Sequence, residues 1–317
     1  MPRAQRKPRF RRVKPPSFRL TERDVAVLHA VFRHRLMDTT HIVALIGGSE
    51  QNLKRRLQLL YHGGYLDRPR TQIAEMLHSP GSSPMVYGLG RKGAEVLRDH
   101  LGIDTGTADW SAKNRAIRQR FLLHTVMVAG IMTAFEVACR EHGRIRLISW
   151  PEILKTKCPE PTKRMKHPQT WRVQVPHVGP IGVTPDKVFG LHYLDRTEGR
   201  NKAYFFLEAD RGTMPISPRS REPKALQKSS ILRKLLAYRE THRQGIHTRR
   251  FGMKNFRVVT VTTSAKRVAN MVEVAKQLDG LQGIFLFAGH SFQGKERTLT
   301  LPWKTGRGES VVLGARV

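Results

Sequence analysis

Residues 49–70 are SEQNLKRRLQLLYHGGYLDRPR, and this stretch decides how the first part of the chain folds. Ser49 has the side chain of a helix N-cap, and the leucines that follow recur on one helical face. The Gly63-Gly64 pair ends the helix, and a short strand is predicted over 65–70. The polar and basic residues between the leucines therefore face outward, as in a helix that enters a DNA groove.

Further elements surround this helix. The sequence predicts one helix starting at Thr21 and a second over 40–46 before it, then a strand over 85–89 and a helix over 91–101 after it. A polar loop joins the two strands. Helix, helix, helix, hairpin and helix form the order of a winged helix-turn-helix, which we predict over residues 20–104.

In such a domain the third helix enters the major groove of double-stranded DNA, and the loop over residues 78–84 forms the wing. The side chains expected to reach phosphates or base edges are Asn52, Lys54, Arg55 and Arg56. A winged helix can also serve protein contacts alone, and this alternative stays open.

Residues 1–19 hold eight basic residues, four prolines and no acid, a composition that cannot bury a core. We predict a disordered basic arm that adds phosphate contacts through Arg9, Arg11 and Arg12. The alternative is a solubilising tail.

The formal net charge is +32, which favours a polyanionic partner and indicates a nucleic-acid-binding protein. The two cysteines, Cys139 and Cys158, form no C-x-x-C pair, so neither a disulfide scaffold nor a zinc site is predicted. No stretch is expected to match the roughly 18 uncharged apolar residues of a membrane span, and no signal peptide is recognised. We therefore expect a cytoplasmic protein associated with the nucleoid or a plasmid, without a membrane partner.

The second part of the chain alternates helices and strands. A long core helix is predicted over 115–142, and the later order of elements describes an α/β domain with a mixed central sheet over residues 105–290. Strands are predicted over 145–149, 181–193, 203–209, 257–262 and 284–288, and helices over 230–242 and 265–278. Residues 291–317 are assigned to a C-terminal basic tail.

Three carboxylates stand at predicted strand ends. Glu208 and Asp210 are two apart and share a face of their strand, and a neighbouring strand can bring Asp186 beside them. Oxygen ligands of this kind suit Mg²⁺, which can share them with a phosphate. Lys234 and Tyr238 follow on one helical face. The alternative is that the acids are rim residues paired with neighbouring cations.

This order of elements and residues resembles the PD-(D/E)xK nuclease superfamily, which has a restriction-endonuclease-like α/β fold. Asp186 matches its first acid, Glu208 its second, and Lys234 with Tyr238 resembles its helix motif. The resemblance implies Mg²⁺ ligands at Asp186, Glu208 and Asp210, with Lys234 as a charge stabiliser. The superfamily has a lysine where this chain has Asp210, so the domain either takes its cation from elsewhere or binds DNA without cutting it.

The chain as a whole resembles the replication-relaxation family of plasmid and mobile-element proteins. The segments that carry the resemblance are LTERD (20–24), LKRRLQLLYHGGYLDR (53–68), VYGLGRKGAEVL (86–97) and LEADRGT (207–213). This resemblance implies a DNA-binding protein that acts in the replication, relaxation or maintenance of such elements.

Two functions on DNA stay open from the sequence, and RNA binding is a third class because charge does not distinguish the two nucleic acids, although a winged helix favours duplex DNA. One is a Mg²⁺-dependent DNA nuclease or nickase that uses Asp186, Glu208, Asp210 and Lys234. The other is a non-catalytic accessory or transcriptional regulatory factor that uses the nuclease-like fold as a scaffold. Replication or conjugation proteins and a second copy of the chain are further expected partners. The glycines 88, 90 and 93 satisfy G-x-G-x-x-G, but no β-α-β unit follows, so a dinucleotide site is not predicted.

Overall fold

The computed structural model describes residues 9–74, 83–106, 109–220, 222–289 and 298–315. The chain divides into two compact units, Met1–Thr133 (unit 1) and Ala134–Val317 (unit 2). The division falls inside helix α7 (Gln119–His142), whereas the sequence placed the boundary at residues 104 and 105. Trp110 and Ile117 explain the difference, because both are buried in the cores of unit 1.

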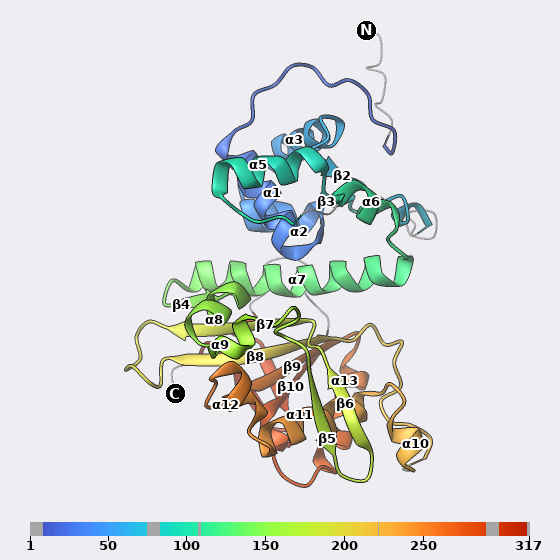
Figure 1. Cartoon of the computed structure of the whole chain (residues 1–317), viewed down its shortest axis with the longest axis vertical. Coiled ribbons are helices and arrows are strands. Elements are labelled where there is room, and N and C mark those ends of the chain that lie inside the picture. The colour runs from blue at the N-terminus through green and yellow to red at the C-terminus, as the bar shows by residue number, and fades with distance from the viewer. Residues whose placement is uncertain (1–8, 75–82, 107–108, 221, 290–297, 316–317) are drawn as a thin grey trace. The chain divides into compact units, whose positions relative to one another are not determined.

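Unit 1 contains the predicted succession of helices (Figure 1). Its described elements are α1 (Glu22–His34), β1 (Leu36–Asp38), α2 (Thr39–Ile46), α3 (Glu50–His62), β2 (Leu66–Asp67), β3 (Val86–Leu89), α5 (Arg91–Leu101) and α6 (Trp110–Arg115). The strands form an antiparallel sheet in the order β1-β3-β2, in which β1 was not predicted. Most of the predicted wing, residues 78–82, lies outside the described residues.

Local signals account for the helix boundaries of unit 1. Thr21 and Asp24 form a reciprocal capping box at the start of α1, and Ser49 caps α3 through the backbone N–H of Asn52. Leu53 and Leu57, on the inner face of α3, are at most 1% exposed. The leucine stripe that the sequence predicted is therefore the face that α3 buries in the core of unit 1.

The segment before α1 differs from the prediction of a disordered arm. The Arg12 Nε atom donates a hydrogen bond to the carbonyl of Tyr61 at 2.9 Å, and its Nη2 atom donates to the carbonyl of Leu66 at 3.0 Å. The backbone N–H of Val13 donates to Nδ1 of His62 at 3.2 Å. Since three separate donors tie residues 12 and 13 to the end of α3 and to β2, this part of the arm has a defined place on unit 1.

Unit 2 is built on a mixed seven-stranded sheet in the order β12-β11-β10-β9-β8-β7-β4 (Figure 1). Its strands are β4 (Ile145–Ile148), β7 (Lys187–Tyr193), β8 (Lys202–Ala209), β9 (Arg257–Thr262), β10 (Phe285–Gly289), β11 (Pro302–Thr305) and β12 (Ser310–Val312). The helical elements are α8 (Trp150–Thr156), α9 (Glu160–Lys163), α10 (Pro223–Leu226), α11 (Ile231–Arg243), α12 (Ile246–Phe251), α13 (Ala265–Lys276) and η1 (Gln282–Ile284). A separate hairpin joins β5 (Trp171–Val175) to β6 (Gly179–Val183).

The central strands β8, β9 and β10 are parallel, and helices α11 and α13 connect them. The remaining neighbours in the sheet are antiparallel. Phe206 of β8 faces α11, where its ring stacks on Tyr238, and Phe205 faces the opposite side of the sheet, where its ring stacks on Phe189. Phe189 in turn packs against Phe135 of α7, so helices cover both faces. The predicted α/β domain with a mixed sheet is confirmed.

Three expectations require correction. The stretch 181–193 is two strands rather than one, because it breaks at Pro185-Asp186. Within the predicted basic tail, β11 and β12 complete the sheet, and Trp303 of β11 is fully buried. Helix α7 is long and apolar enough to cross a membrane, contrary to the expectation that no such stretch exists. Leu122 and Phe135 on this helix are buried against protein, as expected of a core helix.

Candidate functional site

Two of the predicted acids meet at one end of the β7–β8 pair. The β7–β8 ladder ends at the pair Lys187–Leu207, so Asp186 lies just before β7 and Glu208 lies one position past this pair on β8. The backbone N–H of Asp186 donates to the carbonyl of Leu207 at 2.9 Å, and Oδ2 of Asp186 accepts from the backbone N–H of Ala209 at 2.7 Å. These hydrogen bonds, and the electrostatic effect of Asp186 on Glu208, show that the two acids lie close together just past the end of the ladder.

Helix α11 supplies two donors to Glu208. Nζ of Lys234 donates to Oε2 at 2.5 Å, and the hydroxyl of Tyr238 donates to Oε1 at 2.5 Å. Lys234 and Tyr238 are four residues apart and lie on the face of α11 that packs on the sheet. The Glu208 side chain is 5% exposed and the Lys234 side chain is 32% exposed. The result is a cluster of two carboxylates, one ammonium group and one phenol, in which Glu208 and Tyr238 are buried and Asp186 and Lys234 are partly exposed.

Burial and the neighbouring charges both shift the pKa values of the groups in this cluster. Burial raises the pKa of Glu208 above its ordinary value, and the Asp186 charge adds to this effect, while Lys234 opposes it. Burial would lower the pKa of Lys234, but Glu208 and Asp186 together raise it. Burial and the Glu208 charge raise the pKa of Tyr238, which keeps the phenol protonated as a donor. Lys234 is thus a fixed cation held by two acids.

Asp210 has different partners. Its Oδ2 atom accepts from Nε of Arg267 and from the hydroxyl of Thr262, each at 2.5 Å, and its Oδ1 atom accepts from Nη2 of Arg267 at 3.1 Å. The Asp210 charge still contributes to raising the pKa of Lys234, so the two groups are electrostatic neighbours. The sequence did not identify Arg267 or Thr262 as partners, because they lie 57 and 52 residues away from Asp210.

The sequence predicts that the carboxylates of Asp186, Glu208 and Asp210 hold a Mg²⁺ ion, and their hydrogen-bond partners bear on this prediction. Both carboxylate oxygens of Glu208 accept from side-chain donors, and Asp210 is held by a bidentate guanidinium group. Within the described ranges, no group of three or more His, Cys, Asp or Glu side chains is placed to hold a metal ion. The three carboxylates in this arrangement do not fit a shared Mg²⁺ site.

The predicted DNA-contact residues of α3 separate into two groups. Asn52, Lys54 and Arg55 are exposed, and Lys54 forms an exposed ion pair with Glu50 at 2.5 Å. Arg56 turns inward instead, where Nε lies 2.8 Å from Oδ1 of Asp24 and Nη2 lies 2.6 Å from Oδ2. Asp24 is 1% exposed, and the Arg56 guanidinium also lies over the ring of Phe18. Arg56 therefore joins α3 to the start of α1.

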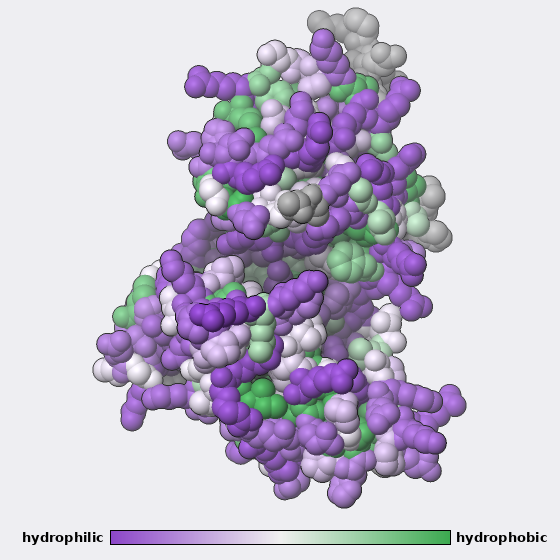
Figure 2. All heavy atoms as spheres, in the orientation of Figure 1, coloured by the Kyte–Doolittle hydropathy of each residue, from purple (hydrophilic) through white to green (hydrophobic). Residues whose placement is uncertain are grey.

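The arginines of the basic arm also differ in their contacts with the rest of unit 1. Arg9, Arg11 and Arg12 are all exposed, but Arg12 also forms an ion pair with Asp67 and lies over the Tyr61 ring. The carbonyl of Arg9 accepts a hydrogen bond from Arg68 at 2.8 Å. Figure 2 shows hydrophilic side chains over much of the drawn face of unit 1. Charged side chains are thus available on the surface of this unit, although Arg12 and Arg56 are also used to hold it together.

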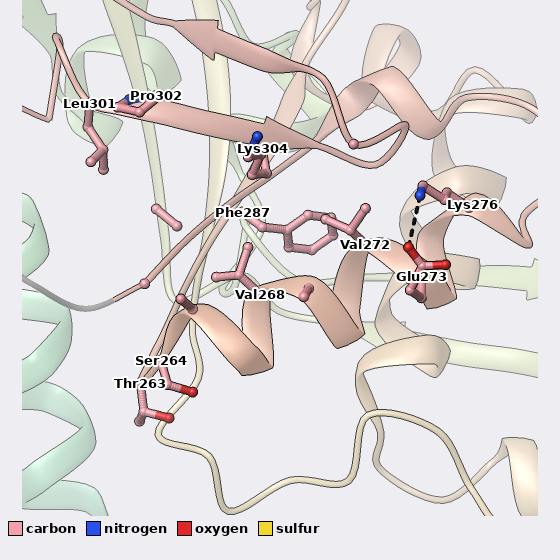
Figure 3. Close-up of a pocket in the computed structure, with 15 residues that line it drawn as sticks. Thr263, Ser264, Val268, Val272, Glu273, Lys276, Phe287, Leu301, Pro302 and Lys304 are labelled. Atoms are coloured by element: carbon pink, nitrogen blue, oxygen red, sulfur yellow. Dashed lines mark hydrogen bonds and ion pairs between the residues drawn. The ribbon is translucent and has the colours of Figure 1, made fainter.

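Unit 2 also has an apolar pocket of about 590 Å³ between α13 and strands β10 and β11 (Figure 3). Val268, Val272 and Phe287 line its floor, and an ion pair between Glu273 and Lys276 stands at its rim. None of the predicted site residues lines this pocket. Its position therefore separates it from the Asp186–Glu208–Lys234 cluster.

Comparison with known proteins places the chain in a family. Neither the curated proteins nor the solved structures gave a match. The family model described as replication-relaxation matches residues 28–256, which is more than half of the chain. The match includes both α3 of unit 1 and the Asp186–Glu208–Lys234 cluster of unit 2. The chain belongs to the replication-relaxation family.

Proposed function

We propose that this protein binds double-stranded DNA of a plasmid or mobile genetic element through unit 1. Membership of the replication-relaxation family indicates a role in the replication or relaxation of such DNA. In this proposal unit 1 is a winged helix, with α3 as the helix that enters the major groove. The order of α1, α2, α3 and the β2–β3 pair supports that assignment.

One observation supports the proposal above all others. The outer face of α3 carries Asn52, Lys54 and Arg55 in exposed positions, while its inner face is fixed by leucines and by the Arg56–Asp24 ion pair. A polar face on a rigidly held helix, in a chain with a net charge of +32, is well suited to a polyanionic groove.

We further propose that unit 2 is a restriction-endonuclease-like domain that serves as a scaffold rather than as a nuclease. The order of strands and helices around β7, β8 and α11 supports the fold. The non-catalytic assignment rests on the cation partners of the acids: Lys234 holds Glu208, and Arg267 holds Asp210.

DNA cleavage is the second candidate function. Asp186, Glu208 and Lys234 converge in unit 2, and two acids with a lysine match the residue types of the PD-(D/E)xK resemblance. Lys234 would then stabilise negative charge on a phosphate. Since the carboxylates do not fit a shared three-acid Mg²⁺ site, we assign no step to a metal.

The test uses the full chain and a labelled 30-base-pair duplex. Fluorescence anisotropy at several salt concentrations should give salt-dependent binding for the wild type, and N52A/R55Q should raise the Kd by about tenfold. The control is Arg98→Gln, which removes an exposed arginine from another helix of unit 1. An unchanged Kd in N52A/R55Q would refute the role of α3.

The same preparations distinguish the two assignments of unit 2. Supercoiled and linear DNA are incubated with Mg²⁺, Mn²⁺ or EDTA, and nicks and breaks are scored for the wild type and for D186A/E208A. We expect binding without cleavage in both proteins. Metal-dependent cleavage that D186A/E208A loses would instead establish a nuclease.

A further inference from the structure

We infer that a cavity of unit 1, distinct from the apolar pocket of unit 2, binds a phosphate group of the DNA backbone. The cavity has a volume of about 440 Å³, and its lining residues include Arg12, His62, Arg91 and Lys92. The inference rests on the proposed DNA-binding function and adds a contact that lies outside the outer face of α3.

The Arg12 side of the cavity is held in place before any ligand arrives. Its guanidinium donates to the carbonyls of Tyr61 and Leu66, pairs with Asp67 and lies over the Tyr61 ring at 5.4 Å. The side chain is nonetheless 40% exposed. A guanidinium fixed in this way loses little freedom when an anion approaches its open side.

His62 also lines the cavity. It is 4% exposed, and its Nδ1 atom accepts from the backbone N–H of Val13. The contact ties Val13, and with it the neighbouring Arg12, to the end of α3.

The first turn of α5 contributes Arg91 and Lys92 to the lining. Arg91 and Lys92 are exposed, the first turn contains no acidic residue, and the N-cap position, Gly90, has no side chain to cap the helix. Arg91 has an ion pair with Glu95 that is long, at 3.9 Å, and exposed. The two side chains add their charges to the positive end of an eleven-residue helix.

The charges of the lining favour an anion. Arg12, Arg91 and Lys92 supply three cationic groups, against one carboxylate, Asp109, whose Oδ1 atom accepts from the backbone N–H of Ala112 at 3.0 Å. A guanidinium, an ammonium group and a helix N-terminus are the usual partners of a phosphate oxygen.

The position of the cavity on α3 favours a phosphate of the DNA backbone as its ligand. The cavity lies at the C-terminal end of α3, beside His62 and Gly63. Asn52 and His62 are ten residues apart on this helix, which corresponds to about 15 Å along its axis. The major groove is about 12 Å wide, so a helix inside the groove brings its far end to the phosphates that border it.

The experiment compares R91Q/K92Q with Arg98→Gln, which removes a cation from the other end of the same helix, in the full chain. Anisotropy with the 30-base-pair duplex is measured from 50 to 300 mM KCl. We expect R91Q/K92Q to raise the Kd by about tenfold and to reduce the slope of log K against log salt by about two. Arg98→Gln should change the Kd by no more than about threefold.

Each outcome decides the inference. If R91Q/K92Q binds DNA as Arg98→Gln does, the cavity takes no DNA phosphate. If the wild type itself shows no salt-dependent binding, the proposed function fails, and the two failures are distinguished by the wild-type measurement alone. A third arm adds inorganic phosphate at constant ionic strength. Stabilisation of the wild type by phosphate that R91Q/K92Q loses, with unchanged DNA binding, would assign the cavity to free phosphate and overturn the inference.

Discussion

Nζ of Lys234 lies 2.5 Å from Oε2 of Glu208, and this ion pair connects α11 to the strand β8. Lys234→Met removes the cation and leaves the Glu208 carboxylate enclosed next to Asp186. Breaking one side of a buried pair is costly, and the partial exposure of Lys234 reduces that cost, so we expect a loss of about 2–3 kcal/mol in the free energy of unfolding. Urea denaturation measures it.

The control is Lys266→Met, at an exposed position of α13, which should change stability by less than about 0.5 kcal/mol. The double variant E208Q/K234M removes both charges together and should be more stable than K234M alone. Equal stabilities of wild type and K234M would show that the ion pair contributes nothing to folding.

A second prediction concerns the neighbours Arg55 and Arg56. Arg56→Gln removes the partner of the buried Asp24, whose pKa is held below its ordinary value by Arg56 and Thr21 against the effect of burial. We expect a loss of about 2 kcal/mol in the stability of unit 1. Arg55→Gln, one position earlier and exposed, should leave stability within about 0.5 kcal/mol of the wild type. Thermal and urea unfolding compare the two, and similar losses in both would contradict the assignment.

Arg56 also shows where reasoning from the sequence stops. Helical spacing predicted which residues of α3 are buried leucines, and the structure confirms them. The same spacing placed Arg56 outside, because it contains no information about Asp24, which is 32 residues away. A charged side chain at the border of the buried face can turn either way, and only the tertiary partner decides.

In the candidate site of unit 2, too, local patterns predicted some positions and distant partners decided the others. The strand pattern placed Glu208 on β8, since side-chain alternation is a local property of a strand. Asp186 lies in the bend before β7, and its hydrogen bonds to Leu207 and Ala209 hold it near Glu208. The partners of Asp210 come from β9 and α13, whose placement depends on the whole sheet. The glycine motif at 88, 90 and 93 has a packing explanation: a Cβ on Gly90 or Gly93 would collide with the backbone of Tyr65.

The third prediction concerns acid stability. Burial and the neighbouring His247 lower the pKa of His242 below its ordinary value of 6.5. The unfolded chain therefore takes up this proton more readily, so stability is fully present above about pH 6.5 and falls as the pH drops towards the folded-state pKa. Urea unfolding at pH 7.5 and 5.5 should show a smaller decrease for His242→Phe than for the wild type. His100→Gln, at an exposed position, serves as the control. An equal decrease in wild type and His242→Phe would exclude His242 as the cause.

The last prediction concerns the two thiols. Burial raises the pKa of Cys139 to about 12, with a further contribution from Glu136, and raises that of Cys158 to about 11. Only the thiolate reacts with alkylating reagents, so both cysteines should label at least about 100 times more slowly in the folded protein than in urea at pH 8. Mass spectrometry of iodoacetamide adducts over time measures the two rates separately. Rapid labelling of Cys158 alone under native conditions would show that the segment between α8 and α9 opens more readily than the core around Cys139.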